Sequence, residues 1–366
     1  MRYSGAGDDG FTGGFVDSHP AAATEVLPLG GTRRRVAHAR PPALATWPWA
    51  LAASVATLAL LLPIQGFVAR PMLLAERFVP GGGWVQALLL SLYAAFLLHR
   101  MMDPKRSGTW RRGTWLMFSV VFFGQLALGL AEFDSFLMTG TLHVPVPAVI
   151  VGGPAFRGEG FFMPILFGST LLLVGPAWCS HLCYIGAWDA LAASRRKRPA
   201  ALPAWRRWSQ PGVLVATVAV GVVLRAAGAE PGTAAAVALA FGIAGIGVMA
   251  FASRRLGAMV HCTAYCPIGW LATRLGRVSP FRLRIATDCT ECGVCAAVCR
   301  YGALERADIA RRRPGPGCTL CGDCVKACRD GFAEYRFAGL RSDRARALFL
   351  VVVVALHAAF LGVARI

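Results

Sequence analysis

The stretch at residues 289–299 reads Cys289-Thr-Glu-Cys292-Gly-Val-Cys295-Ala-Ala-Val-Cys299, and the stretch at residues 318–328 reads Cys318-Thr-Leu-Cys321-Gly-Asp-Cys324-Val-Lys-Ala-Cys328. Both have the spacing C-x₂-C-x₂-C-x₃-C. Three thiolates at this spacing can bind three irons of a cubane [4Fe–4S] cluster, while the fourth cysteine binds the other cluster of the pair. The spacing therefore predicts two clusters with crossed ligands. The first would be held by Cys289, Cys292, Cys295 and Cys328, and the second by Cys318, Cys321, Cys324 and Cys299.

Zinc is the main alternative for these cysteines. A zinc knuckle is built from two C-x₂-C pairs per site, whereas each stretch here carries three closely spaced cysteines and a fourth, and the whole pattern occurs twice. Gly293 and Gly322 follow the second cysteine of each stretch, where they let the backbone turn tightly and direct N–H groups at sulfide. Iron–sulfur ligation explains all of these features.

Residues 281–337 resemble the bacterial two-cluster ferredoxins on these motifs. Arg300 and Arg329 stand where the ferredoxin motif has proline after its fourth cysteine. That proline shapes the turn but binds no iron, so its replacement leaves the predicted ligands in place. The resemblance implies an α+β ferredoxin-like domain, at about residues 280–340, that carries two clusters.

The rest of the chain is too apolar for an ordinary soluble protein. Of its 366 residues, 56% are hydrophobic and 16% are charged, and the mean hydropathy is +0.53, whereas soluble domains carry about 25% charged residues. Lys and Arg number 38 against 19 Asp and Glu, which gives a net charge of +19. Such an excess fits either a nucleic-acid partner or loops held on the cytoplasmic face of a membrane.

Seven apolar segments are close to the ~20 residues that a helix needs to cross a bilayer. They cover residues 47–68, 84–98, 115–131, 161–178, 212–228, 234–252 and 345–363. This pattern predicts a mostly α fold: a polytopic transmembrane bundle of about seven helices, with the two-cluster domain inserted before the last. The predicted domains are a flexible cytoplasmic tail at 1–44, a six-span membrane domain at 45–279, the ferredoxin-like domain at 280–340 and the seventh helix at 341–366.

The basic residues alternate from loop to loop. The second and fourth loops are rich in Lys and Arg, the third also carries acidic residues, and the fifth carries no Lys or Arg. Because cytoplasmic loops are enriched in positive charge, the alternation predicts a bacterial inner-membrane protein with its N-terminus and all twelve cysteines in the cytoplasm and its C-terminus outside. The excess of positive charge is then explained by the orientation of the chain in the membrane. We therefore expect membrane lipid as a partner and no nucleic acid. Cytoplasmic thiols stay reduced, which disfavours disulfides.

The remaining four cysteines form an internal repeat. Cys179-Ser-His-Leu-Cys183-Tyr-Ile-Gly follows the fourth predicted span, and Cys262-Thr-Ala-Tyr-Cys266-Pro-Ile-Gly follows the sixth. Two thiolates four residues apart lie on one side of a helical turn. Two such turns brought together could supply four ligands to a third iron–sulfur cluster or another soft-metal centre. His181 and His261 are further candidate ligands.

Other interpretations of this repeat stay open. Copper is the main rival metal, because soft thiolates also suit Cu(I). A metal-free thiol or disulfide relay is a second alternative, and four unconnected cysteines at the membrane interface are a third.

Paired C-x₃-C motifs in a multi-span chain, followed by a two-cluster ferredoxin module, resemble the membrane polyferredoxins. This family includes the NapH and MauN types, the core of NosR and the CcoG/FixG/RdxA group, and the resemblance covers about residues 115–340. Tyr184 stands where the family motif has proline. The chain shows neither the flavin-binding domain of NosR nor the Ig-like domain of the CcoG group, so it is most similar to the NapH/MauN type. The resemblance implies an electron-transfer subunit of a larger complex, with quinol dehydrogenase activity as its enzymatic form.

A few polar residues near the spans are candidates for a quinone site. Glu132 and Asp134 end the third span, next to a long loop, about 133–160, that contains His143. Ionisable groups at membrane depth are functional candidates, and these three could line a quinone pocket in which a carboxylate takes up the protons of quinol. An ordinary interfacial cap and loop is the alternative. His99 and His357 lie at different predicted depths, which does not match a pair of haem ligands.

We expect a membrane-bound iron–sulfur protein that relays electrons between the quinone pool, or a membrane partner, and redox partner proteins. The first alternative is a copper reductase or maturation factor of the CcoG type, in which the C-x₃-C cysteines bind and reduce the metal. The second is a membrane anchor for a soluble redox enzyme, with no cofactor in the membrane domain.

Overall fold

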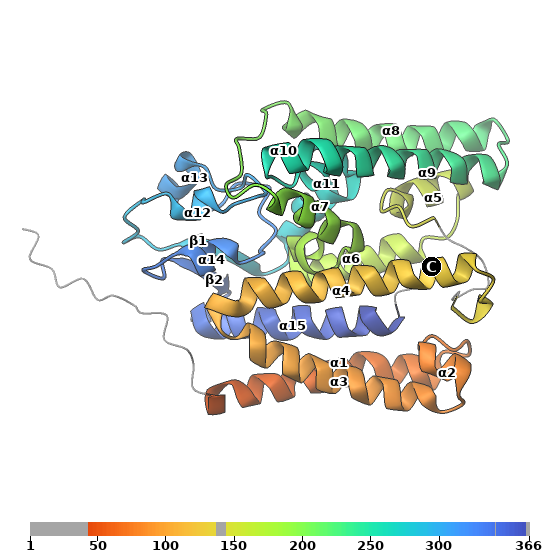
Figure 1. Cartoon of the computed structure of the whole chain (residues 1–366), viewed down its shortest axis with the longest axis horizontal. Coiled ribbons are helices and arrows are strands. Elements are labelled where there is room, and N and C mark those ends of the chain that lie inside the picture. Colours follow the sequence, from red (N-terminus) through yellow and green to blue (C-terminus); the bar gives the residue numbers. More distant parts are fainter. Residues whose placement is uncertain (1–42, 137–143, 341, 364–366) are drawn as a thin grey trace, which may run out of the picture. The chain divides into compact units, whose positions relative to one another are not determined.

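The computed structural model describes residues 43–136, 144–340 and 342–363. Within these residues, seven helical segments are long and apolar enough to cross a membrane, in agreement with the predicted number, so the chain is mostly helical and consistent with a multi-pass membrane protein (Figure 1). They are α1 (Ala43–Phe67), α3 (Gly82–Met101), α4 (Pro104–Leu130), α6 (Phe162–Val174) with the helical turns that continue it to Leu182, α8 (Arg206–Ala226), α9 (Pro231–Val248) with the turns that continue it to Leu256, and α15 (Ser342–Val363). The tail predicted at 1–44 lies outside the described residues, except that its last two residues, Ala43 and Leu44, begin α1.

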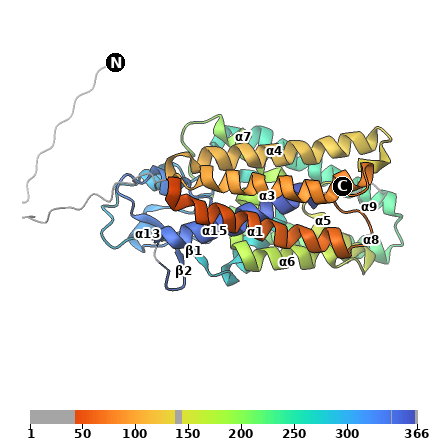
Figure 2. The ribbon, with the colours of Figure 1, turned by 90° about the horizontal axis from the view of Figure 1, so that it is seen from below.

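The last helix, α15, is the most buried of the seven. The structure buries 67% of its apolar window, against 6% for α8 and 11% for α9. Figures 1 and 2 show α15 running beside α1 and α3, and these helices are in contact. A helix that is buried on most of its faces needs apolar residues all round, and residues 349–356 of α15 are apolar without interruption.

The third span begins earlier than its apolar stretch, predicted at 115–131. It is part of α4, which starts at Pro104 because Asp103 caps the helix by accepting the backbone N–H of Lys105 at 2.9 Å. Proline is also favoured at the first position of a helix. The basic residues that follow raise the polarity of this segment, but Lys and Arg are good helix formers, so the helix forms where hydropathy alone does not predict a span.

The long loop predicted at about 133–160 contains a further helix, α5 (Val149–Arg157). It packs against α8 at a very close approach, since a Cβ added to Gly221 would lie 2.9 Å from the carbonyl oxygen of Gly152. Two other short helical elements lie between the long helices. They are α2 (Leu74–Phe78), between α1 and α3, and the 3₁₀ turn Asp134–Phe136, after α4.

The region predicted as the ferredoxin-like domain begins and ends with strands β1 (Phe281–Ile285) and β2 (Ala333–Phe337), which pair antiparallel with Phe281 opposite Phe337. Both cysteine stretches lie between these strands. They are accompanied by the short helices α12 (Val294–Ala297), α13 (Arg306–Ala310) and α14 (Asp323–Ala327). Tyr335 of β2 stacks on Phe349 of α15 with 4.9 Å between ring centroids. The strand pair is therefore anchored to α15, the most buried of the seven spans.

Candidate metal centre

The two C-x₃-C motifs adopt the same local structure. Each begins with one turn of π-helix, at Trp178–Leu182 and at His261–Tyr265. The turns close when the N–H of Cys183 donates to the Trp178 carbonyl at 3.0 Å and the N–H of Cys266 donates to the His261 carbonyl at 2.8 Å. Single π turns are rare and often occur at functional sites. The sequence repeat is thus also a structural repeat.

The second cysteine of each motif caps a helix. Cys183 precedes α7 (Tyr184–Ser194) and Cys266 precedes α11 (Pro267–Leu275). The first N–H groups of a helix have no partner within it, and here they face sulfur. The N–H groups of Ile185 and Gly186 point at Cys183, and those of Ile268 and Gly269 point at Cys266. The shared Ile-Gly pair therefore supplies donors that can stabilise a thiolate.

The glycine of each motif also leaves no room for a side chain. A Cβ on Gly186 would lie 2.8 Å from the Cys179 carbonyl oxygen, and a Cβ on Gly269 would lie closer still to the Cys262 carbonyl oxygen. In both motifs the start of the new helix packs directly on the backbone of the first cysteine. This packing holds the two cysteines of one motif at a fixed relative position.

The structure brings the two motifs together, so that four thiols share one site. The Cys262 thiol lies within electrostatic range of Cys183, Cys179 and Cys266. Cys179, Cys183 and Cys266 are buried. Burial raises the pKa of Cys183 to about 12 and that of Cys266 to about 11. Such thiols ionise only where a cation compensates their charge, which is what a bound metal does.

Two side chains from distant helices hold the motifs in place. Trp115 of α4 donates its indole N–H to the Cys183 carbonyl at 2.6 Å. Gln210 of α8 donates to the carbonyls of Cys262 and Cys266 at 2.8 and 3.1 Å. Neither residue belongs to a recognisable motif, so neither role could be predicted from the sequence.

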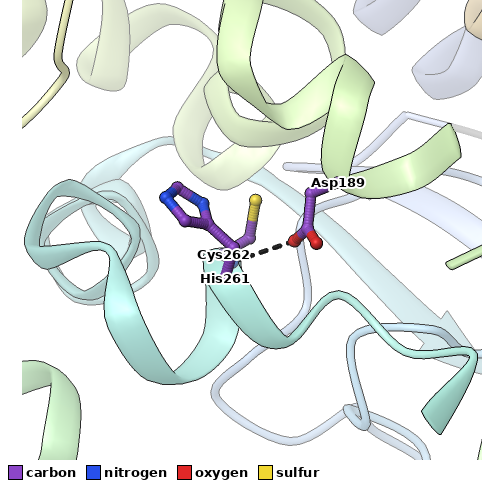
Figure 3. A group of neighbouring side chains, drawn as sticks. All are labelled: Asp189, His261 and Cys262. Atoms are coloured by element: carbon purple, nitrogen blue, oxygen red, sulfur yellow. Dashed lines mark hydrogen bonds between the residues drawn. The ribbon is translucent and has the colours of Figure 1, made fainter. Parts of the chain in front are cut away.

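A carboxyl group lies beside the four thiols. Asp189, Cys262 and His261 have ligand atoms within 4.8 Å of one another, and Asp189 accepts the backbone N–H of Cys262 at 3.0 Å (Figure 3). Asp189 Oδ1 and His261 Nδ1 are buried without a hydrogen-bond partner among the described residues. Of the two candidate histidines, His261 therefore lies in the site, whereas the His181 ring is paired with the Ser180 hydroxyl at 2.9 Å.

The cysteines of the two longer stretches gather in two sets. The Cys295 thiol lies within electrostatic range of Cys289, Cys328 and Cys292. The Cys324 thiol lies within electrostatic range of Cys321, Cys318 and Cys299. Each set contains three cysteines of one stretch and the last cysteine of the other, and that each set holds one cluster stays a prediction.

The two sets differ in exposure and in their backbone donors. Cys292 of the first set is exposed, while Cys324 of the second set is buried. The Cys299 sulfur accepts the N–H of Ala303 at 3.3 Å, and the N–H groups of Tyr301 and Leu304 also point at it. Burial raises the pKa of Cys318 to about 12. The second set thus has the drier and more completely hydrogen-bonded surroundings.

The second set is joined directly to the four-thiol site. The Ser180 hydroxyl, between Cys179 and His181, donates to the carbonyl of Thr319 at 2.8 Å. Arg111 of α4 is 4% exposed and donates to the Ser180 carbonyl at 3.1 Å and to Asp323 at 2.9 Å. These contacts tie the first C-x₃-C motif to residues that neighbour Cys318 and Cys324.

Arg300, which stands in the position of the ferredoxin proline, is a structural anchor. Its guanidinium donates to the carbonyls of Ala193, Gly257 and Arg196 at 2.6, 2.5 and 3.0 Å. Ala193 lies in the last turn of α7, Arg196 follows this helix, and Gly257 follows the sixth span. The arginine therefore fastens the end of the first cysteine stretch to the membrane domain, a contact that proline could not make.

The surroundings of these thiols fit a bound group. Five buried polar atoms without a hydrogen-bond partner in the described part of the chain surround the four-thiol site and the second set. They are Arg111 Nε, Asp189 Oδ1, His261 Nδ1, Tyr301 OH and Thr319 Oγ1. Unpaired buried polar atoms are costly, so their concentration here indicates that something besides the protein fills the site. Clustered thiolates are the ligands that iron–sulfur clusters and other soft metals prefer.

Of the three quinone candidates, Glu132 and Asp134 lie among the described residues. Glu132 is exposed just after α4, and Asp134 lies in the 3₁₀ turn Asp134–Phe136. His143 lies outside the described residues. His357 lies in the middle of α15, where it is hydrogen-bonded to the Tyr93 hydroxyl at 3.1 Å.

Comparison with known proteins points to the same region. A family model described as a 4Fe-4S binding domain matches residues 159–200. The match contains Cys179 and Cys183 of the first C-x₃-C motif, and also Asp189. No curated protein and no solved structure matches the chain. A 4Fe-4S binding domain is therefore present, and it includes half of the four-thiol site.

Proposed function

We propose that this chain is a membrane-bound iron–sulfur protein of the polyferredoxin type, most similar to the NapH/MauN type, that relays single electrons between the quinone pool, or another membrane partner, and redox partner proteins. It would act as one subunit of a larger complex. The 4Fe-4S domain and the seven apolar helices are consistent with a membrane iron–sulfur electron-transfer protein.

The chain offers ligands for three iron–sulfur centres. Two are the crossed sets of the ferredoxin-like region, held by Cys289, Cys292, Cys295 and Cys328 and by Cys318, Cys321, Cys324 and Cys299. The third is the centre that Cys179, Cys183, Cys262 and Cys266 would hold. An iron–sulfur cluster supplies a site that gains or loses one electron at a potential set by its surroundings. The chain's own residues exclude water, direct backbone N–H groups at sulfur and fix the ligands.

The observation that carries this proposal is the joining of the four-thiol site to the second set. Through Ser180 and Thr319 the two sites share a direct hydrogen bond, at 2.8 Å, in a buried interface. A membrane anchor without a cofactor does not need a buried group of four thiols, nor does it need to hold them against the ferredoxin-like region. An electron relay needs both.

The proposed orientation follows from charge. The basic loops lie on the side that carries the cysteines, so we place the N-terminus and the iron–sulfur region in the cytoplasm of a bacterium and the C-terminus outside the inner membrane. Arg206, which binds the Gly302 carbonyl, and Arg300, which binds the Ala193 carbonyl of α7, contribute both to the positive charge and to the attachment of the iron–sulfur region to the membrane domain.

Reduction by a quinol tests the proposal. The anaerobically purified chain is mixed with duroquinol, and the visible absorption of its iron–sulfur clusters is followed. We expect bleaching in the wild type and much less in Cys179→Ala, because the variant would lack the centre nearest the bilayer. Bleaching by dithionite but not by duroquinol would exclude the quinone pool as the donor.

The group formed by Asp189, His261 and Cys262 favours a second candidate function, a copper or other metal reductase. Sulfur, nitrogen and oxygen ligands within 4.8 Å can hold a single metal ion without a cluster. Metal analysis distinguishes the two functions: copper bound in proportion to the chain, and lost in His261→Ala, would favour the reductase.

A further inference from the structure

Tyr301 lies between the four-thiol site and the second set of cysteines, and its backbone is fixed on both sides. Its N–H points at the Cys299 sulfur, and its carbonyl accepts from Arg206 of α8 at 3.2 Å. The residue is 5% exposed. The ring therefore has little freedom to turn away from its neighbours.

The ring fills the space between the two groups of thiols. It belongs to a buried apolar cluster with Trp115, Ala187, Ala193 and Met259, and the partly buried Cys262, Cys299 and Cys321 pack against that cluster. Cys262 belongs to the four-thiol site, while Cys299 and Cys321 belong to the second set. Tyr335 lies in the larger buried cluster, which also contains thiols of both groups.

The hydroxyl of Tyr301 is buried and has no hydrogen-bond partner in the described part of the chain. It lies within electrostatic range of the Cys262, Cys321 and Cys179 thiols and of Arg111. A guanidinium offers only donors, so Arg111 provides no acceptor for the hydroxyl hydrogen. By contrast, the buried hydroxyl of Tyr335 donates to the Leu320 carbonyl at 2.7 Å. Tyr301 therefore has a free donor directed into a thiol-lined region.

We propose that Tyr301 donates a hydrogen bond to a sulfur atom of the centre held by Cys179, Cys183, Cys262 and Cys266, and thereby raises the reduction potential of that centre. The proposal rests on the proposed function, since it requires a cluster at the four thiols. The four-thiol centre is chosen over the second set because two of its thiols, Cys262 and Cys179, lie within electrostatic range of the hydroxyl, against one thiol, Cys321, of the second set.

The expected effect has a definite sign. A hydrogen bond to sulfur draws negative charge away from the cluster and favours its reduced form. In a buried, dry site such a bond is stronger than in water. A hydrogen bond to a charged group shifts an equilibrium by about tenfold or more, and a tenfold shift corresponds to about 59 mV for a one-electron couple. Tyr301 is thus a positioning and tuning residue, which neither gains nor loses the electron itself.

A redox titration of the anaerobically purified full chain, followed by EPR, tests the proposal. The signal of the four-thiol centre is identified as the one lost in Cys262→Ala. We expect Tyr301→Phe to lower the midpoint potential of that signal by about 59 mV, with unchanged iron content and unchanged midpoints for the other signals. Tyr335→Phe is the matched control, because its hydroxyl already has an acceptor, and it should leave the midpoint of the four-thiol centre unchanged.

An unchanged midpoint in Tyr301→Phe, or a shift confined to the second set, would overturn the inference. If the variant loses iron, replacing Tyr301 with 3-fluorotyrosine gives a second test, because this stronger donor should raise the midpoint, and no rise would overturn the inference. Absence of a signal that depends on Cys262 in the wild type is a different result. It would overturn the proposed third centre itself, and the inference with it.

Discussion

Arg111 on α4 and Asp323 on α14 form an ion pair with 2.9 Å between Nη2 and Oδ2. Arg111 is 4% exposed, and its other terminal nitrogen donates to the Ser180 carbonyl. One buried guanidinium therefore connects a membrane helix, the first C-x₃-C motif and the second cysteine stretch. The two sites proposed for electron transfer are therefore held together by the contacts of this one side chain.

Removing the carboxylate of this pair should destabilise the chain. Asp323→Ala leaves a buried guanidinium without its counter-charge, which typically costs about 3–5 kcal/mol. We expect the visible iron–sulfur absorption to be lost at a lower temperature than in the wild type, as measured in a thermal melt in detergent. Arg112→Ala is the control, because Arg112 is 46% exposed and lies 3.6 Å from the same carboxylate. An exposed pair contributes about 1 kcal/mol or less, so equal effects of the two variants would contradict this account.

The glycines of the two motifs should be required for metal binding. In Gly186→Ala and Gly269→Ala the added methyl group meets the carbonyl oxygen of the first cysteine of the motif, at 2.8 Å for Gly186 and closer for Gly269, and the backbone cannot yield as a flexible side chain can. Overpacking of this kind costs about 1–3 kcal/mol. We expect each variant to lose about four irons per chain, the content of one cubane, by iron analysis.

Gly168→Ala and Gly247→Ala are the matched controls for these glycine variants. They lie on α6 and α9, the helices that lead to the two motifs, and an added Cβ meets nothing within 4 Å at either position. They should retain all of the iron. Iron loss in the controls as large as in the motif variants would show that the glycines act through general helix stability.

Asp189→Asn should raise the potential of the four-thiol centre. Asparagine keeps an oxygen that can accept the Cys262 N–H, now bonded at 3.0 Å, but it removes a negative charge that disfavours the addition of an electron. We expect a rise of about 60 mV or more in an EPR-monitored redox titration. In Asp308→Asn, another buried carboxyl that accepts a backbone N–H, from Glu305 at 2.9 Å, the same midpoint should not move. A fall or no change in Asp189→Asn would contradict the assigned role.

The first set of cysteines should release its iron before the others. Cys292 is exposed, whereas Cys179, Cys183 and Cys266 of the four-thiol site and Cys324 of the second set are buried, and solvent exposure makes a cluster more accessible to oxidants and chelators. We expect mild oxidation with ferricyanide in the presence of EDTA to remove first the signal that depends on Cys289. Earlier loss of the signal that depends on Cys262 would show that the buried centre is the more accessible one.

Local patterns explain what could be predicted from the sequence. The spacing of the cysteines and the apolar segments are properties of short stretches, so the number of apolar helices was predicted correctly and the repeat of the two C-x₃-C motifs was recognised. The start of α4 was missed because hydropathy does not record the Asp103 cap, and α5 was missed because its nine residues are too few to form a span.

Tertiary contacts explain what could not be predicted. Trp115, Gln210 and Asp189 act on cysteine backbones that lie 68, 52 and 73 residues away, and single residues of these types occur in many other roles. The meeting of the two motifs follows from the packing of whole helices. The Ile-Gly pair is the exception, because its repetition after both motifs could have indicated that its N–H groups face the second cysteine.

Iron and acid-labile sulfide analysis of the anaerobically purified chain, in the wild type and in Cys262→Ala, tests the central claim most directly. Three cubane centres predict about twelve irons per chain in the wild type and about eight in the variant, with loss of one EPR signal. About eight irons in both proteins would contradict the account, because the ferredoxin-like region alone would then hold all of the iron and the four thiols in the membrane domain would hold none.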